Sequence, residues 1–374
     1  MKSMKFIVTL LLSVVILCGC NNEKKQETFK IGALLSLHGD NDTQGKLAKN
    51  GILLAVEKIN AAGGINGKQV ELVVEDTYTD DETTFNGMKK LATIDSVQGI
   101  VVTGDKELPI VNQLADKYGI PVMATICTGM LDDYRSDYVY RYCYNEEQED
   151  EYLMRFIRED LGVNNMALLY PKSDAGDAFY KYSKKYIDAN NITVVADIKY
   201  DVKSSDQRDD ALKVVKSNPD IVCARGFGSS LDALLKSIGE EGYQGRVAGD
   251  LSLSASELNR HKNSLLDGAY IVASEFDLHS EDPAIKSYTD AYIAKYKKDP
   301  CFWDAIGYDS FLYLCYALKE SEEKSVDFNT ALFSIRPNDL LLGENWFEDG
   351  DKDLKFNAMH IFEMKNGQLS KKIK

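Results

Sequence analysis

The sequence predicts an α/β protein in which two doubly wound parallel sheets lie side by side. Short β-branched runs alternate with longer amphipathic stretches along most of the chain, and this order is typical of right-handed β-α-β units. The alternation forms one series before about residue 142 and a second series after it. A length of 374 residues suits two such domains better than a single sheet of ten or more strands.

The expected strands are short runs rich in β-branched residues. They comprise residues 29–35, 70–75, 99–102, 121–124, 166–170, 193–198, 220–223, 246–248 and 269–273. Between them lie helical patterns, such as the apolar residues at positions 231, 234, 235 and 238, which share one face of a helix. The same helical spacing relates Phe179, Tyr182 or Ser183, and Tyr186. The segment 139–145 then serves as a crossover between the two series.

The first residues indicate export and a lipid anchor. Lys2 and Lys5 precede an apolar run over 6–17, which is the length of a signal-peptide core and too short for a membrane span. Gly19-Cys20 resembles a lipobox, so we expect cleavage before Cys20 and acylation of its thiol. The polar residues that follow, to about residue 28, predict a flexible tether. No later segment is long and apolar enough to cross a bilayer.

The charge and the cysteine content limit the possible partners and the state of the thiols. The formal net charge is −15, which argues against nucleic acid as a partner and suits a protein that works outside the cytoplasm. Beyond Cys20 the chain has an odd number of cysteines, none in a C-x-x-C pair, and most lie in apolar runs. We therefore expect buried thiols that behave as small apolar side chains.

Motifs of catalysis and cofactor binding are absent from the sequence. The chain has no G-x-S-x-G, G-x-x-x-x-G-K-[ST], H-E-x-x-H or G-x-G-x-x-G. Its four histidines are far apart, so we expect no metal site, and no cofactor. The acidic run at 349–353 lacks the spacing and final Glu of an EF-hand, which favours a solvated turn. Cys127 is the one cysteine in a segment that follows a strand near the cleft, and a buried thiol there is favoured over a nucleophile.

A ligand site is expected beyond the carboxyl ends of the strands. Segments there are rich in Gly, Ser, Thr and Asp. Backbone amides at Asp105, Lys106 or Thr128 could hold a small anion, whereas Asp80 is interpreted as a helix N-cap. Arg225 follows an apolar strand and precedes Gly-Phe-Gly, so it is either a clamp for a ligand carboxylate or an arginine paired with one of the many acidic residues.

Several motifs resemble one family of ligand receptors. The sequence Ile31-Gly-Ala-Leu-Leu-Ser-Leu-His-Gly39, the string from Asn60 to Lys68, Glu75-Asp76, Gly119-Ile-Pro-Val122, Gly307-Tyr-Asp309 and a closing strand near residues 360–365 carry the likeness. It covers nearly all of the chain after the tether. The chain resembles the type I periplasmic binding proteins, and more narrowly the branched-chain amino-acid receptors of ABC transporters.

The resemblance implies two Rossmann-like lobes joined by three hinge crossings, with the ligand enclosed in the cleft between them. The expected segments are a signal peptide at 1–19, a tether at 20–28, lobe 1 at 29–142 and 275–336, and lobe 2 at 143–274 and 337–374. The cysteine pair that bridges the first lobe in some members is replaced here by Tyr78 and Gly104.

The resemblance also implies ligand contacts, and this chain departs from several of them. Asp105, Lys106, Thr128 and the backbone of Ile126 match positions that hold the ligand in the first lobe. In the second lobe Ala175 replaces an aromatic residue, and Phe227 keeps an aromatic ring without a hydroxyl. Leu251 stands where the family has an acidic partner for the ligand ammonium, with Asp250 adjacent. Trp303 matches an aromatic residue that faces the ligand side chain.

The expected function is therefore capture of a small amino-acid-like or carboxylate-bearing metabolite, without catalysis, and its delivery to an ABC permease. We expect a monomer held by a lipid anchor to the cell membrane, facing the periplasm or the cell exterior. The alternative is a sensor of the same fold that signals through a membrane partner.

Overall fold

The computed structural model describes residues 27–38, 42–127, 136–226, 229–256, 258, 264–274, 276–278, 280–355, 359–365 and 368–373. The strands are β1 (Phe29–Leu35), β2 (Val70–Asp76), β3 (Ile100–Thr103), β4 (Val122–Thr125), β5 (Val139–Arg141), β6 (Asn165–Pro171), β7 (Thr193–Tyr200), β8 (Ile221–Ala224), β9 (Arg246–Asp250), β10 (Tyr270–Ser274), β11 (Met359–Lys365) and β12 (Gln368–Lys372). The helices are α1 (Asp42–Ala61), α2 (Asp81–Lys90), α3 (Leu108–Tyr118), α4 (Glu146–Glu159), α5 (Asp174–Ala189), α6 (Arg208–Ser217), α7 (Ser229–Glu240), α8 (Pro283–Tyr296), α9 (Phe302–Lys324) and α10 (Phe328–Ser334), with a π-helical turn η1 (Leu91–Asp95) and a 3₁₀ turn η2 (Leu251–Ala255). Within these described stretches, no helix combines the length and the apolar character that crossing a membrane requires.

The strands form two sheets, as the sequence predicts. The first has the order β2-β1-β3-β4-β5 and the second the order β12-β11-β10-β9-β8-β6-β7. Strands β1–β5 pair in parallel, and so do β6–β10, whereas β11 and β12 are antiparallel. The predicted α/β class with two parallel-type sheets is confirmed. The short β5, expected only as a crossover, and the final strand β12 were not predicted as strands.

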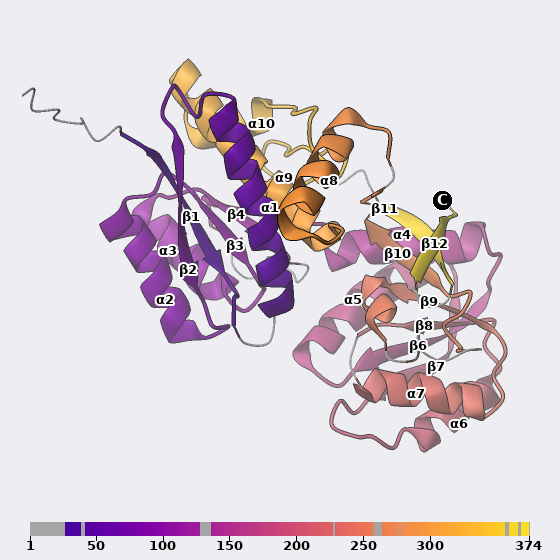
Figure 1. The fold of residues 1–374 in the computed structure, drawn as a ribbon. Helices are drawn as coiled ribbons and strands as arrows, with labels where there is room; N and C mark the ends of the chain where they lie inside the picture. Colours follow the sequence, from indigo (N-terminus) through magenta and orange to yellow (C-terminus); the bar gives the residue numbers. More distant parts are fainter. Residues whose placement is uncertain are drawn as a thin grey trace, which may run out of the picture.

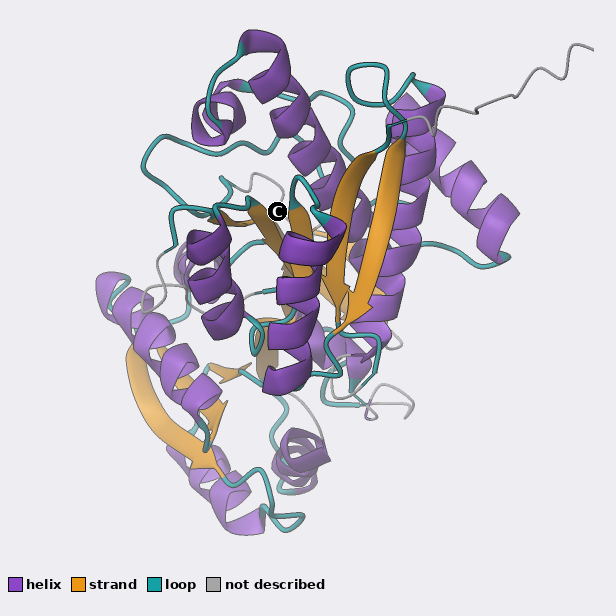
Figure 2. Cartoon of the chain, turned by 90° about the vertical axis from the view of Figure 1, so that its left-hand side faces the viewer, coloured by secondary structure: helices purple, strands orange, loops and turns teal. Residues whose placement is uncertain are grey.

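The central strands of each sheet are buried, because helices cover both of their faces. In β1, Ile31, Ala33 and Leu35 join a core cluster with residues of α1 and α9, whereas Leu34 points to the opposite side, toward Met88 of α2. Figure 2 shows strands of the first sheet lying between groups of helices. A strand covered on both faces has no need of polar alternation, which explains the continuous apolar runs in the sequence.

The chain passes between the two lobes three times, as the family resemblance implies. It leaves the first sheet after β5, returns after β10 to the helices α8 and α9, and rejoins the second sheet at β11. Figure 1 shows α8, α9 and α10, in orange, on the side of the molecule that holds β1–β4, although they follow β10 in sequence. Helix α9 packs along α1 and against β4.

Two of these crossings are tied to each other. Arg141, at the end of β5, is completely buried, and its Nε lies 3.0 Å from Oδ1 of Asp353 in the third crossing. The backbone N–H of Arg141 donates to Lys352, and Leu354 donates back to Arg141. Asn145 Nδ2 donates to Oδ2 of Asp353 at 3.1 Å. The acidic run at 349–353 is thus a turn whose last residue belongs to the hinge.

The segment after residue 336 packs on helix α9 and on the end of the first sheet. Backbone amides of Leu341 and Leu342 donate to the buried carboxylate of Asp309 on α9. Phe347 packs its ring against Tyr140, Tyr142 and Tyr313. We therefore propose that the second part of lobe 1 extends to Lys355 rather than ending at residue 336.

Close packing of α1 on α9 depends on glycine. A Cβ added at Gly51 would lie 1.8 Å from the carbonyl oxygen of Asp304, and one at Gly307 would lie 2.4 Å from the carbonyl oxygen of Ala48. Both contacts are with helix backbone, which cannot yield without moving a helix. The two helices therefore approach at these positions only because the side chains are absent.

Replacing Gly51 with alanine is expected to lower the free energy of unfolding by about 1–3 kcal/mol, because α1 and α9 must separate. Gly239→Ala in α7 is a matched control, since the nearest atom to the added Cβ, on Leu265, is 3.9 Å away. The control should be neutral or slightly stabilising, because alanine favours helix. Urea unfolding of both variants measures the difference, and equal stabilities would contradict the packing argument.

Candidate functional site

The carboxyl ends of β1, β2 and β3 are held together by one buried carboxylate. Oε1 of Glu107 accepts hydrogen bonds from the hydroxyls of Ser36, at 2.9 Å, and Thr77, at 2.8 Å. The backbone N–H of Ser36 donates to Oγ1 of Thr103 at 3.0 Å. All four side chains are buried. This network fixes the loops of lobe 1 at the strand ends, where a ligand is expected.

The predicted first-lobe contacts lie on those loops. Asp105 and Lys106 are exposed residues between β3 and α3. Ile126 follows β4 with a φ of +56°, a left-handed conformation that is rare for a β-branched residue. Such backbone strain is concentrated at functional sites, so it supports a role for the Ile126 peptide. Thr128 lies outside the described residues.

In the second lobe Arg225 is 0% exposed and surrounded by carboxylates. Its Nη2 donates to Oε2 of Glu149 at 3.1 Å. Its Nη1 lies 3.3 Å from Oδ2 of Asp250, and its Nε lies 3.7 Å from Oδ1 of Asp150. The guanidinium also stacks over the ring of Phe179, 4.9 Å from the centroid. The sequence left two roles open for Arg225, and these contacts give its charge partners within the chain.

The carboxylates come from the helix that begins at the hinge. Asn145 caps α4 with a reciprocal capping box, in which its side chain accepts from Gln148 N–H and the Gln148 side chain accepts from Asn145 N–H. Glu146, Glu149 and Asp150 follow at positions that share one helix face, and all three are buried. With Asp250 they form what we call the carboxylate cluster. Acidic groups in the first turn are favoured by the helix dipole.

Burial raises the pKa of several of these carboxyls. Desolvation raises the pKa of Glu146 to about 8, and the charges of Asp105, Asp150 and Asp250 add to it, while Arg225 opposes it. Desolvation also raises the pKa of Asp150 to about 6, and it holds the pKa of Glu149 well above its usual range. Glu146, Glu149 and Asp150 therefore hold protons more tightly than ordinary carboxyls do.

The structure brings together Arg225 and Asp250 among the predicted site residues. Asp250 ends β9 and caps η2 by accepting from the backbone N–H of Ser252. Leu251 is the first residue of η2 and is partly buried. Trp303, in the first turn of α9, is partly buried with its ring 5.1 Å from that of Phe302.

The structure describes the predicted ligand contact at Ala175 only in part, and it does not describe the one at Phe227. Ala175 lies in the first turn of α5, and its side chain is outside the described part of the structure. Phe227 lies outside the described residues, as does Cys20.

Sequence reasoning missed Glu146, Glu149, Asp150 and Phe179. The signal was present for the acidic residues, because positions 146, 149 and 150 follow an i, i+3, i+4 pattern directly after an Asn-x-x-Gln capping box. Acidic residues on one face are usually solvated, so the pattern alone does not distinguish burial from exposure. Phe179 was recognised only as an apolar helix position.

The cap at Asp80 and the state of the cysteines were also predicted from the sequence. The predicted N-cap at Asp80 is confirmed, since its side chain accepts from Thr83 N–H. Among the described residues the cysteines are free thiols, and Cys127, Cys143, Cys223 and Cys315 are buried, as expected. Burial raises the pKa of the Cys127 thiol well above its ordinary value, so this thiol is poorly suited to act as a nucleophile.

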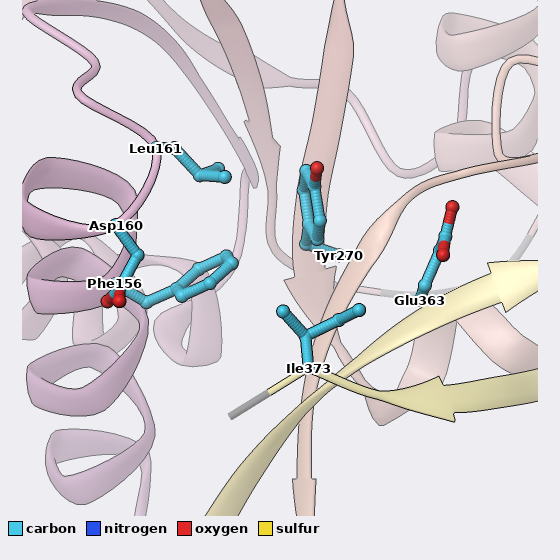
Figure 3. Close-up of a pocket in the computed structure, with 6 residues that line it drawn as sticks. All are labelled: Phe156, Asp160, Leu161, Tyr270, Glu363 and Ile373. Carbon is cyan, nitrogen blue, oxygen red and sulfur yellow. The ribbon is translucent and has the colours of Figure 1, made fainter.

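A hollow of about 320 Å³ lies elsewhere on lobe 2. Phe156, Leu161, Tyr270 and Ile373 line it together with Asp160 and Glu363 (Figure 3). Tyr270 begins β10 and Phe156 lies near the end of α4, so the hollow is at the amino edge of the sheet. It contains none of the predicted ligand contacts.

Comparisons with known proteins agree with this architecture. A family model described as periplasmic binding protein matches residues 28–368. Leu/Ile/Val-binding protein homolog 3 of Brucella melitensis is 25% identical over 355 residues, which cover 91% of this chain and 92% of that protein.

Two solved structures share the fold. The branched-chain amino acid transporter substrate-binding protein LivJ from Streptococcus pneumoniae, in complex with isoleucine, aligns with a TM-score of 0.75 and 21% identity, covering 92% of this chain and 99% of that one. A solute-binding protein of an ABC transporter from Rhodopseudomonas palustris, in complex with 3,4-dihydroxybenzoic acid, aligns with a TM-score of 0.74 and 19% identity, covering 90% and 93%. With a family match that spans both lobes, the chain belongs to the type I periplasmic binding proteins.

Proposed function

We propose that the protein is an extracytoplasmic solute-binding lipoprotein. It captures a small amino-acid-like or carboxylate-bearing metabolite between its lobes, releases it unchanged and delivers it to an ABC permease. The observation that carries the proposal is the meeting of polar strand ends with the helix that begins at the hinge. Arg225 after β8 pairs with Asp250 after β9 and with Glu149 of α4.

The similar proteins support the ligand class. The Brucella melitensis relative is named for leucine, isoleucine and valine, and the two solved structures hold isoleucine and 3,4-dihydroxybenzoic acid. Each of these ligands carries a carboxylate. We place the anion contact in the first lobe, at the strained Ile126 peptide and Thr128, with Asp105 and Lys106 nearby. Phe227 and Trp303 supply apolar walls.

Arg225 acts as a positioning residue in this proposal. Its charge is shared among Glu149, Asp150 and Asp250, so a ligand carboxylate would have to compete with three internal ones. The guanidinium therefore orients the carboxylate cluster rather than clamping a ligand anion.

A screen of the purified protein tests the proposal. Amino acids and aromatic carboxylates are added in thermal unfolding experiments, each beside its decarboxylated counterpart, such as L-leucine beside 3-methylbutan-1-amine. A ligand at a hundredfold excess over Kd stabilises by about 2.7 kcal/mol. We expect the carboxylate to raise Tm more than its counterpart and to be recovered unchanged by mass spectrometry. Equal shifts, or a chemically altered ligand, would contradict the proposal.

Thr128→Ala is expected to weaken the same ligand roughly ten- to a hundredfold, as loss of a hydrogen bond to a charged group does. Asp80→Ala is the control, because Asp80 only caps α2. Unchanged affinity in Thr128→Ala would exclude the first-lobe anchor.

The lipid anchor is tested separately. Cys20→Ala should release the protein from membranes into the soluble fraction, because acyl chains on Cys20 provide the attachment. Cys127→Ala, which alters a buried thiol instead, should leave the protein in the membrane fraction. Membrane attachment that persists in Cys20→Ala would overturn this part of the proposal.

A further inference from the structure

The carboxylate cluster contains more carboxyl groups than its arginine pairs with. Glu146, Glu149, Asp150 and Asp250 are four carboxyls, and the structure gives Arg225 ion pairs with three of them. Buried charges are costly unless they are paired, and the remaining carboxyl belongs to Glu146.

Glu146 is 6% exposed, and its side chain has no hydrogen bond or ion pair in the described structure. Its Oε2 is buried without a hydrogen-bond partner. Oδ2 of Asp150 is likewise buried and unpartnered, although Oδ1 accepts from Ser183 at 3.0 Å. Two carboxylate oxygens within one cluster thus lack donors.

The position of Glu146 points to the cleft rather than to a lobe interior. It is the first residue of α4, directly after the hinge residue Asn145. Asn145 joins the third crossing through its hydrogen bond to Asp353, and Asp150, on the same face of α4, lies beside Arg225 of the second lobe. The unpaired group therefore lies where the two lobes meet.

We propose that the carboxylate cluster is a subsite for an organic cation, an ammonium or guanidinium group of the ligand, which donates to Glu146 and Asp150. This inference rests on the proposed solute-binding function and narrows its ligand to a compound that carries a positive group. Among the residues the structure describes, no group of three or more His, Cys, Asp or Glu side chains is arranged to hold a metal ion, which favours an organic cation.

The subsite differs from the position where the family resemblance places an acidic residue. That position is Leu251 in this chain, and Leu251 has no charge to offer. Glu146 and Asp150 supply carboxylates from α4 instead. A charge lost from the loop after β9 is thus replaced from the helix at the hinge.

The test uses the full-length protein and pairs of probes that differ only in charge. L-lysine is compared with L-2-aminoheptanoate, in which a methyl group replaces the terminal ammonium, and 1,4-diaminobutane with 1-aminopentane. Calorimetry should show at least tenfold tighter binding of the more cationic member of one pair. Binding should release protons from the cluster, so the measured heat should change with the ionisation enthalpy of the buffer.

Glu146→Gln is expected to remove that preference and to reduce the proton release. Glu147→Gln is the matched control, because Glu147 is partly exposed and pairs with Lys185. If Glu146→Gln does not fold, the wild-type protein still decides the question. Its affinity for the cationic probe should rise between pH 6 and pH 9 as Glu146 loses its proton, and a flat profile would overturn the subsite.

The outcomes separate the two proposals. If neutral amino acids or carboxylates bind and the cationic probes show no preference, the cation subsite is wrong and solute binding stands. If none of these compounds binds, both proposals fail. A preference that Glu146→Gln leaves intact places the cation elsewhere and also overturns the assignment.

Discussion

Replacing Arg225 with methionine is expected to lower the free energy of unfolding by about 3–5 kcal/mol, the usual effect of breaking a buried ion pair. The substitution keeps much of the volume that packs on Phe179. Among the described residues, it removes the one cation that pairs with Glu149, Asp150 and Asp250. The remaining carboxyls would repel one another in a buried setting.

Arg208→Met is the control for this prediction. Arg208 forms an exposed ion pair with Asp206, and pairs of that kind contribute about 0–1 kcal/mol. Denaturant unfolding at pH 7 should separate the two variants clearly. Similar small losses would mean that the carboxylate cluster does not depend on Arg225 for its charge balance.

The second large effect is a fall in stability as pH rises from about 5 to 8. Desolvation raises the pKa of Glu146 to about 8, of Asp309 to about 7 and of Asp150 to about 6. In this interval the unfolded chain has already released protons that the folded protein still holds. The folded state binds more protons, so the free energy of unfolding decreases with pH. Since each pKa unit corresponds to roughly 1.4 kcal/mol, these shifts together amount to several kcal/mol.

Glu146→Gln isolates one part of this dependence. The variant should match the wild-type protein near pH 5, where Glu146 is protonated, and exceed it in stability at pH 8. Its own decline with pH should be shallower, because Asp150 and Asp309 still titrate. Thermal unfolding across the pH range measures this, and parallel curves for the two proteins would show that Glu146 is not a buried acid.

The fold could be predicted largely from the sequence because both sheets are made of local apolar runs. The run at 29–35 coincides with β1, and the remaining predicted strands agree with the structure to within two residues at each end. The strand β5 was missed because only three of its residues pair. The proposed extension of lobe 1 to residue 355 could not be predicted, because it depends on contacts with Asp309 and Tyr140, which are distant in sequence.

The site could be predicted less well because it is assembled from charges on separate elements. Arg225 was identified from its place after a strand. Two of its partners, Glu149 and Asp150, lie on a helix much earlier in the chain, and Glu149 is 76 residues away. A helix with several acidic residues has the same pattern whether they face solvent or a buried arginine. Only the three-dimensional arrangement distinguishes these cases.

The bond between Arg141 and Asp353 has a mechanical consequence. Two of the three connections between the lobes run next to each other as a parallel bridge, fastened by this ion pair and by Asn145. Twisting one lobe against the other would shear that bridge and expose a buried guanidinium, whereas bending leaves it intact. We therefore expect the lobes to move relative to one another mainly by bending about this bridge, with Glu146, at the start of α4, close to the pivot.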